Sequence, residues 1–247
     1  MRKVALLAVV AMLAVNAYAV EIGIGGKLGA GIGWGHITEG VNSSSIDAAI
    51  QTRQLGLPIG GEVFVNLGVS ELIGLQLGVA FSYALGIGDI SDRGRVDGVN
   101  NGDWSSWETW PSAITDDLRL SIISVGLDIL VRFNLPLNLP IGLYVSVGPN
   151  IGYSNARTTA TSDIAGYADD GDYIGSHFLD ITGVLEFGAA IPLGPGALNI
   201  NLRSRIGGGF SLASYDQDGS IELESDEFVR RFIGEVAALR IGYSINF

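Results

Sequence analysis

Residues 240–247 read Arg-Ile-Gly-Tyr-Ser-Ile-Asn-Phe, and this stretch decides the fold. Apolar side chains stand at every second position, at Tyr243, Ile245 and Phe247, with small or polar residues between them. A period of two places the apolar set on one face of a β-strand and the polar set on the other. Because an apolar edge strand invites mispairing in water, the stretch favours a sheet that closes on itself.

The same alternation recurs in seven segments that precede this strand, so the sequence predicts eight β-strands. After the N-terminal segment, glycine or a polar residue interrupts every apolar run, so no further stretch predicts a membrane-spanning helix. The predicted strands comprise residues 20–36, 57–69, 73–87, 118–133, 141–153, 178–193, 197–212 and 228–247.

The predicted connections alternate in length, with long ones at residues 37–55, 88–117, 156–177 and 213–227 and short turns between them. An even number of strands, short periplasmic turns and longer outer loops are typical of transmembrane barrels. We therefore predict an all-β, eight-stranded antiparallel up-and-down transmembrane β-barrel with both ends on the periplasmic side. A soluble lipocalin-like barrel is the alternative, and it would turn its apolar face inward.

The N-terminus has the layout of a secretory signal peptide. Two basic residues precede an apolar run over residues 4–15, and residues 17–19 read Ala-Tyr-Ala, a small-residue cleavage site. The alternative is a retained membrane anchor, but an anchor needs ~20 apolar residues and this run is shorter. We therefore predict a cleaved signal peptide over residues 1–19 and one outer-membrane barrel domain over residues 20–247.

The composition separates an apolar part of the chain from an acidic part. The chain has 36 glycines, 16% charged residues and no cysteine, and its net charge is −12. A mean hydropathy of +0.37 beside such acidity indicates one zone in lipid and another in water. The absence of cysteine excludes disulfides, and the acidity excludes nucleic acid as a partner because phosphate binding needs Lys and Arg. No cofactor is predicted.

Two predicted strands change parity along their length. In the fourth strand the apolar face switches near Ile123 and Ser124, and in the eighth it switches near Gly234 and Glu235. An extra residue in a strand produces such a switch, so we predict a β-bulge at each place. In the eighth strand the bulge would turn Arg231 and Glu235 inward; alternatively, the upper part of this strand lies above the membrane.

If the apolar face meets lipid, the polar face fills the lumen, and its charges nearly balance. Eight strands leave an interior only wide enough for side chains, so we predict a plugged lumen with paired charges instead of a pore. The turn near residues 194–195 brings Glu186 near Arg203 or Arg205. Asp128 and Arg132 share one face of one strand, which favours their pairing. The predicted network comprises Lys27, Glu62, Asp128, Arg132, Asp180, Glu186, Arg203, Arg205 and Arg240.

Arg240, Gly242, Ile245 and Phe247 fill a pattern that resembles the C-terminal signal by which outer-membrane barrel proteins are recognised for insertion. The whole predicted barrel looks like the small eight-stranded outer-membrane proteins of the OmpA transmembrane-domain and OmpX type. This resemblance implies the bacterial outer membrane, its lipid and the barrel assembly machinery as partners. OmpW-type barrels are similar in size but known for an apolar lumen, from which the charged lumen here departs.

The long loops carry most of the acid, and a solvated surface is the simplest interpretation. Asp216 and Asp218 precede Gly219 in a sequence that is similar to part of a calcium-binding loop. Aligned on this glycine, however, the first and twelfth positions of the loop are Ser214 and Ser225. These two aspartates therefore remain a weak candidate, and no other metal site is predicted.

Trp104, Trp107 and Trp110 are spaced by three within the second long connection. They predict a local cluster that packs this loop, or an aromatic belt against lipid headgroups, or a contact surface for an extracellular partner.

Histidine is the usual acid–base residue of outer-rim enzymes, and this chain has only His36 and His177. The residues near His177 in sequence that could assist catalysis are Ser176, Asp169, Asp170 and Asp180. No nucleophile signature accompanies them, so no catalytic residue and no enzymatic activity are predicted.

The sequence thus indicates a monomeric outer-membrane protein that presents acidic loops in a structural, surface-interaction or adhesion role to an unknown extracellular ligand. The alternatives are a narrow porin or small-solute, OmpW-like channel and, more remotely, a rim-active outer-membrane enzyme.

Overall fold

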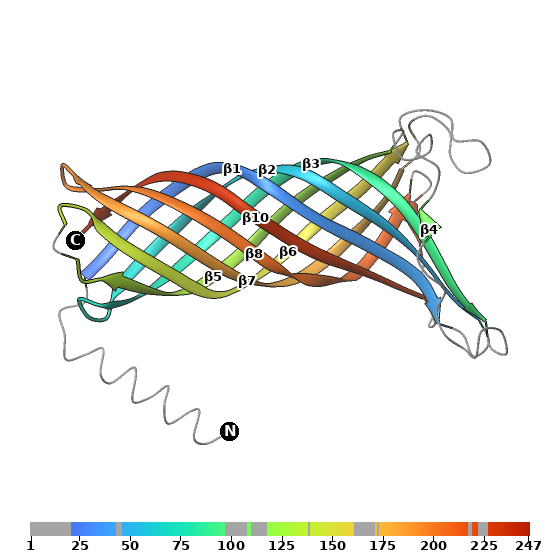
Figure 1. The fold of residues 1–247 in the computed structure, drawn as a ribbon, viewed down its shortest axis with the longest axis horizontal. Helices are drawn as coiled ribbons and strands as arrows, with labels where there is room; N and C mark the ends of the chain where they lie inside the picture. Colours follow the sequence, from blue (N-terminus) through green and yellow to red (C-terminus); the bar gives the residue numbers. More distant parts are fainter. Residues whose placement is uncertain are drawn as a thin grey trace, which may run out of the picture.

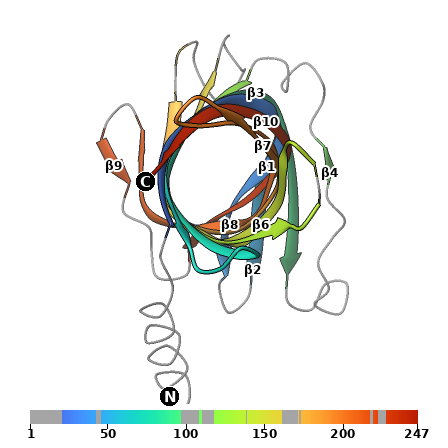
Figure 2. The same ribbon diagram turned by 90° about the vertical axis from the view of Figure 1, so that its left-hand side faces the viewer.

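The computed structural model describes residues 21–42, 46–96, 108–109, 118–137, 139–160, 171, 173–216, 219–221 and 227–247. Its long strands form one closed antiparallel barrel, seen from the side in Figure 1 and along its axis in Figure 2. The strands of the wall are β1 (Glu21–Asn42), β2 (Ile46–Gly68), β3 (Ile73–Val96), β5 (Leu118–Leu135), β6 (Gly142–Ala160), β7 (Tyr173–Leu193), β8 (Gly196–Asp216) and β10 (Glu227–Asn246).

Each wall strand pairs with its neighbours along the chain, and β10 also pairs with β1. This pairing confirms the predicted eight-stranded up-and-down barrel. Two short strands lie beside the wall: β4 (Glu108–Thr109) pairs with β3, and β9 (Gly219–Ile221) pairs with β8. Among the described residues, no helix is long and apolar enough to cross a membrane.

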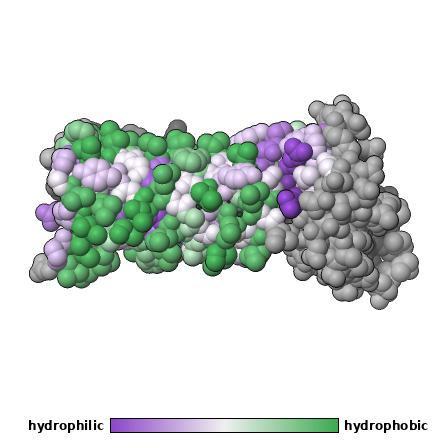
Figure 3. Space-filling model, turned by 90° about the horizontal axis from the view of Figure 1, so that it is seen from above, coloured by the Kyte–Doolittle hydropathy of each residue, from purple (hydrophilic) through white to green (hydrophobic). Residues whose placement is uncertain are grey.

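The apolar faces point outward. Leu28, Leu57 and Ile206 are more than 60% exposed, whereas inward-facing Lys27 and Arg203 are almost completely buried. Figure 3 shows the hydrophobic residues that cover much of one side of the barrel wall. An apolar exterior over a charged interior requires lipid as the surrounding solvent. The soluble lipocalin-like alternative is therefore wrong.

The short turns lie at one end of the barrel, at residues 69–72, 136–141 and 194–195. Gly194 adopts a left-handed φ of 60°, which tightens the turn between β7 and β8. Ile22 and Phe247 lie side by side at this end, where the Phe247 amide donates to the Ile22 carbonyl at 2.8 Å. The two ends of the barrel therefore share one side of the membrane, as predicted. The predicted signal peptide, residues 1–19, lies outside the described residues.

At the opposite end the strands are longer than predicted. β1 continues to Asn42 and β2 already begins at Ile46, so the predicted long loop 37–55 is wrong. β3 likewise continues to Val96, inside the predicted loop 88–117. The sequence of these extensions mixes polar and apolar residues without a regular period of two, so it did not indicate strands. The backbone ladder needs no such period, because every pair of antiparallel strands can exchange main-chain hydrogen bonds.

One of the two predicted bulges is wrong. β5 pairs with β3 and with β6 in an unbroken register through Ile123 and Ser124. Leu120 and Ile122 do not switch face but point into the barrel, where they are buried. The second bulge is confirmed, slightly later than predicted: Ile32 lies opposite Ala237 and Gly33 opposite Glu235, so Val236 is the extra residue.

Candidate functional site

The centre of the lumen holds a network of buried charges around Arg203 of β8. Its Nη1 lies 2.6 Å from Asp128 Oδ2 and 3.2 Å from Glu186 Oε1, and its Nη2 lies 3.0 Å from Asp128 Oδ1. The same Nη1 is 3.7 Å from Glu62 Oε2. Arg203 therefore joins acids from β2, β5 and β7 across the width of the barrel.

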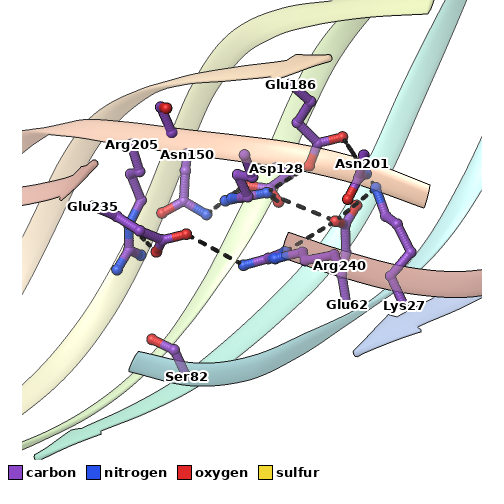
Figure 4. A network of polar contacts seen from close by, with 12 residues as sticks. Lys27, Glu62, Ser82, Asp128, Asn150, Glu186, Asn201, Arg205, Glu235 and Arg240 are labelled. Atoms are coloured by element: carbon purple, nitrogen blue, oxygen red, sulfur yellow. Dashed lines mark hydrogen bonds and ion pairs between the residues drawn. The ribbon is translucent and has the colours of Figure 1, made fainter. Parts of the chain in front are cut away.

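Two further cations complete this network. Lys27 of β1 donates its Nζ to Glu186 Oε2 at 3.0 Å and lies 3.2 Å from Glu62 Oε2. Arg240 of β10 reaches Glu62 Oε2 at 3.4 Å. Figure 4 shows these side chains converging from different strands on the barrel axis. Because water is excluded from them, each charge depends on its protein partners for stabilisation.

Neutral amides occupy the remaining hydrogen-bonding positions of the carboxylates. Gln76 Nε2 donates to Glu62 Oε1 at 2.6 Å, and Asn150 Nδ2 donates to Asp128 Oδ1 at 2.7 Å. Asn201 Nδ2 donates to Glu186 Oε2 at 3.2 Å. Buried ion pairs stabilise a fold best when their remaining polar atoms are also satisfied. These amides satisfy carboxylate oxygens, whereas Arg203 Nε and Asn201 Oδ1 are buried without a hydrogen-bond partner among the described residues.

Strand register explains why these residues meet. Glu186 lies directly opposite Arg203, and Lys27 directly opposite Glu62, each pair on neighbouring strands. Gly78 makes room for the acid of β2, since a Cβ placed there would lie 2.3 Å from Glu62 Oε1. Gly78 thus leaves space for a long charged side chain of the neighbouring strand.

A second group of charges lies on the loop side of the network. Arg231 of β10 donates to Asp180 Oδ2 at 3.3 Å and to Ser154 Oγ. Glu235 lies 3.8 Å from Arg205 Nε and 4.0 Å from Arg240 Nη2. The sequence left the orientation of Arg231 and Glu235 open. Both are buried, because the bulge at Val236 turns them inward.

Arg132 is not part of the central network. Its guanidinium lies 3.7 Å from the centre of the Tyr144 ring, and its Nε donates to Asn134 Oδ1 at 3.0 Å. The expected pairing with Asp128 is therefore wrong, since Asp128 binds Arg203 instead. Arg132 lines a polar cavity of about 120 Å³ near the short turns.

An apolar layer closes the lumen above the charges, on the loop side. Its members come from four different strands and have almost no exposed surface. The sequence pattern did not indicate this layer, because the bulge expected in β5 placed Leu120 and Ile122 on the outer face. The layer comprises Ile37, Leu120, Ile122, Ala156 and Phe178, with Ala84 packed against it.

A cavity of about 40 Å³ lies beside this layer, lined in part by Ile122, Arg205 and Arg231. A space of this size holds a few water molecules. The layer and the network together fill the cross-section of the barrel with side chains from its wall.

The histidines do not assemble a catalytic site with Ser176. Ser176 points inward and hydrogen-bonds Ser214 at 2.9 Å, whereas the His177 Nδ1 contacts the Tyr153 hydroxyl and the Asn155 amide on the outer face. Asp180 lies inside with Arg231. His36 stacks on Phe232, with ring centroids 5.3 Å apart. Asp169 and Asp170 lie outside the described residues.

The other candidate residues fall in different places. Arg240 and Gly242 belong to the lumen side of β10, while Ile245 and Phe247 are exposed at the end with the short turns. Asp216 ends β8. Within the described ranges, no group of three or more His, Cys, Asp or Glu residues is placed to hold a metal ion. Outside these ranges lie Asp218, Trp104, Trp107 and Trp110.

A family model described as the outer membrane protein beta-barrel domain matches residues 5–203. Among solved structures, a major outer membrane protein of Thermus thermophilus has a TM-score of 0.50 at 16% identity, with 93% of this chain and 100% of that chain covered. OprG of Pseudomonas aeruginosa has a TM-score of 0.42 at 13% identity, with 92% and 95% covered. The protease OmpT of Escherichia coli has a TM-score of 0.42 at 8% identity, with 91% and 97% covered. No curated protein matches the chain.

Proposed function

The chain belongs to the outer membrane protein β-barrel family and resides in the bacterial outer membrane, and from this premise we propose that it is a closed, non-conducting barrel with a surface-interaction role. The membrane-spanning part is a rigid support. The ends of the strands and the connections on the far side from the short turns form the part that meets an extracellular ligand.

The observation that carries this proposal is the double closure of the lumen. Four basic and four acidic side chains from β1, β2, β5, β7, β8 and β10 meet in the central network and its Glu235–Arg205 branch. The apolar layer of Ile37, Leu120 and Phe178 lies above them. An ion that crossed the lumen would have to break paired charges and then enter an apolar section, and both steps are costly.

The interaction role is supported by what lies beyond the lipid belt. β1, β2 and β3 continue well past their outward apolar faces, and β4 and β9 add short strands at this end. The part of each strand within the lipid belt anchors the barrel, so the length beyond the belt is not needed for anchoring. Trp104, Trp107 and Trp110 remain predicted contact residues for the extracellular ligand, since clustered aromatics are characteristic of binding surfaces.

A non-enzymatic role fits the placement of Ser176 and His177, which point to opposite faces of β7. A nucleophile and its base must lie within hydrogen-bonding reach of each other, and these two neighbours do not. We further propose insertion by the barrel assembly machinery through Arg240, Gly242, Ile245 and Phe247, with the signal peptide of residues 1–19 removed.

Reconstitution in a planar bilayer tests the closed barrel. We expect the wild-type protein to show no steady unitary conductance, although a gel-mobility shift on heating demonstrates that it is folded. A defined, persistent conductance from the folded wild-type protein would establish a narrow channel instead.

The interaction role is tested separately with Trp104→Ala. We expect this variant to insert and fold normally while binding of whole cells to host surfaces or matrix proteins is reduced. Phe133→Ala, which truncates an exposed aromatic side chain on the lipid-facing wall, serves as the matched control. Equal binding by both variants and the wild type would exclude the tryptophans from the contact surface.

A further inference from the structure

The lipid-facing wall is interrupted by an apolar groove of about 780 Å³. The groove follows a single row of paired residues across five strands. Along this row Pro149 lies opposite Gly183, Gly183 opposite Ile206, Ile206 opposite Gly234, and Gly234 opposite Trp34. It therefore runs obliquely over the barrel, from the middle of β6 to the upper part of β1.

The groove is deepest at Gly183, because the other positions of the row carry side chains: Ile206 is 61% exposed, and the Trp34 ring covers Gly234. Gly183 has no side chain, so the backbone of β7 forms part of the floor. Ile181, Leu185 and Val236 rise beside it as the walls and are exposed. Thr182, Arg205 and Glu235 also line the groove but are turned toward the barrel interior, whereas the Ser204 hydroxyl donates to the Val236 carbonyl at 2.6 Å. Its polar group is satisfied within the protein, so the groove suits an apolar occupant.

The upper end of the groove has the chemistry of a membrane interface. The Trp34 ring lies over Gly234, where an added Cβ would come within 2.7 Å of Trp34 Nε1. Trp34 also packs on Phe232, with ring centroids 5.0 Å apart. Arg230 is exposed on the same outward face of β10, two residues above Phe232. Tryptophan and arginine together are typical of the headgroup level of a bilayer.

The dimensions agree with one hydrocarbon chain. Four steps between neighbouring strands, at about 4.8 Å each, give the groove a length of ~19 Å. One leaflet of a bilayer contributes half of a hydrocarbon core that is ~30 Å thick. An acyl chain that enters at Trp34 therefore has the length to follow the groove to Pro149.

We propose that the groove binds one acyl chain of an anionic membrane lipid, whose headgroup lies beside Trp34 and Arg230. The groove is continuous with the belt that already contacts lipid, so lipid is the molecule that fills it. A chain seated there contacts protein on several sides, whereas a chain on the flat wall contacts it on one side, and dispersion contacts add up accordingly.

Gly183→Leu is the variant that tests this site. A Cβ on Gly183 meets nothing nearer than the Ile206 carbonyl oxygen at 3.8 Å, so the leucine fits the fold and fills the groove. Gly26→Leu is the matched control. Gly26 also faces outward with an open Cβ position, 3.6 Å from the Glu62 carbonyl oxygen, but it lies on β1 far from the groove.

Each full-length protein is reconstituted in phosphatidylglycerol vesicles, extracted into mild detergent and weighed by native mass spectrometry. We expect one retained lipid per wild-type and per Gly26→Leu barrel. In Gly183→Leu retention falls about tenfold, which corresponds to ~1.4 kcal/mol of lost binding. The heat-dependent gel shift shows that all three proteins are folded.

Three results would overturn the proposal. Equal lipid retention in Gly183→Leu and the wild type would mean that the groove does not select a chain. Loss of retention in both glycine variants would indicate a general effect on the lipid-facing wall. A wild-type dimer that Gly183→Leu converts to monomer would assign the groove to a second copy of the chain. If Gly183→Leu does not fold, Gly183→Ala with its smaller side chain is compared with Gly26→Ala by the same measurement.

Discussion

At the scale of single residues, Arg203 has the most demanding position in the barrel. It is completely buried and contacts three carboxylates from three strands. Removal of one partner from a buried ion pair leaves the other charge uncompensated. The effect of a substitution is therefore expected to exceed the strength of any one contact.

We predict that Arg203→Ala lowers the free energy of unfolding by ~3–5 kcal/mol, because it leaves Asp128, Glu186 and Glu62 without their shared cation. Urea unfolding in lipid vesicles measures this change. The control is Arg205→Ala, and we expect a smaller loss because its acid, Glu235, lies 3.8 Å away and keeps Arg240 at 4.0 Å. Equal losses in both variants would contradict the special role of Arg203.

A double-substitution cycle tests the Arg203–Asp128 pair directly. Asp128→Ala alone removes the nearest of the three carboxylates around Arg203, but in the Arg203→Ala background the same change removes a charge that is already uncompensated. We therefore expect the two losses to be non-additive, with a coupling of ~1–3 kcal/mol. Additive losses would mean that the two side chains do not stabilise each other.

Gly78 is a residue whose size matters for the same network. A Cβ at this position would lie 2.3 Å from Glu62 Oε1 and displace the acid from Lys27 and Gln76. We predict that Gly78→Val costs ~1–3 kcal/mol of stability through overpacking, as measured by urea unfolding. Gly26→Val, at a position with open space, should be close to the wild type; a similar loss there would mean that crowding of Glu62 is not the cause.

At the scale of elements, β10 combines the functions of wall strand, seam and source of lumen charges. Its bulge at Val236 allows Ile241 and Ile245 to face lipid below it while Arg231 and Glu235 face the lumen above it. Without the extra residue, one of these two sets would point the wrong way, because side chains alternate strictly along a strand.

Deletion of Val236 is predicted to prevent folding or to destabilise the barrel severely. The upper half of β10 would slip by one residue, and Arg231 and Glu235 would turn toward lipid, at up to ~2–4 kcal/mol for the arginine near mid-membrane. The folded fraction on heat-modifiable gels measures the effect. Val236→Ala preserves the chain length and should fold; if the deletion folds equally well, the bulge is dispensable.

The elements also show what the sequence could and could not predict. Lipid-facing segments such as Ile73–Leu85 could be predicted as strands, because a face that contacts lipid must be apolar at every second residue. The register that joins Lys27 to Glu186 across the lumen was not readable, since it depends on how the barrel closes. The wrong bulge in β5 has the same origin: Leu120 and Ile122 looked misplaced only because an apolar interior layer was not considered.

At the scale of the whole molecule, two layers of different chemistry lie in the lumen. The network contains the paired charges around Arg203, and the apolar layer contains Leu120, Ile122 and Phe178. We expect either layer alone to obstruct ions, since one requires paired charges to separate and the other presents apolar side chains. The closure is therefore redundant, and a substitution in one layer should leave the barrel electrically silent.

We predict conductance only when both layers are opened. Leu120→Ala/Ile122→Ala and Arg203→Ala should each remain closed in planar bilayers, whereas their combination should show frequent openings. The control combination replaces the apolar pair with lipid-facing Ile123→Ala/Leu127→Ala, which leaves the apolar layer intact. Conductance in either single-layer variant would show that the other layer does not seal the lumen.

The length of β3 determines how far the protein stands above the bilayer. Its 24 residues, at about 3.3 Å each and tilted by ~40°, rise ~60 Å along the barrel axis, whereas an apolar belt is ~25 Å tall. Some 30 Å of hydrogen-bonded sheet therefore projects as a stiff pedestal. An extracellular macromolecule can meet the tip of this pedestal without approaching the headgroups, so the height of the barrel sets the distance at which two surfaces are held apart.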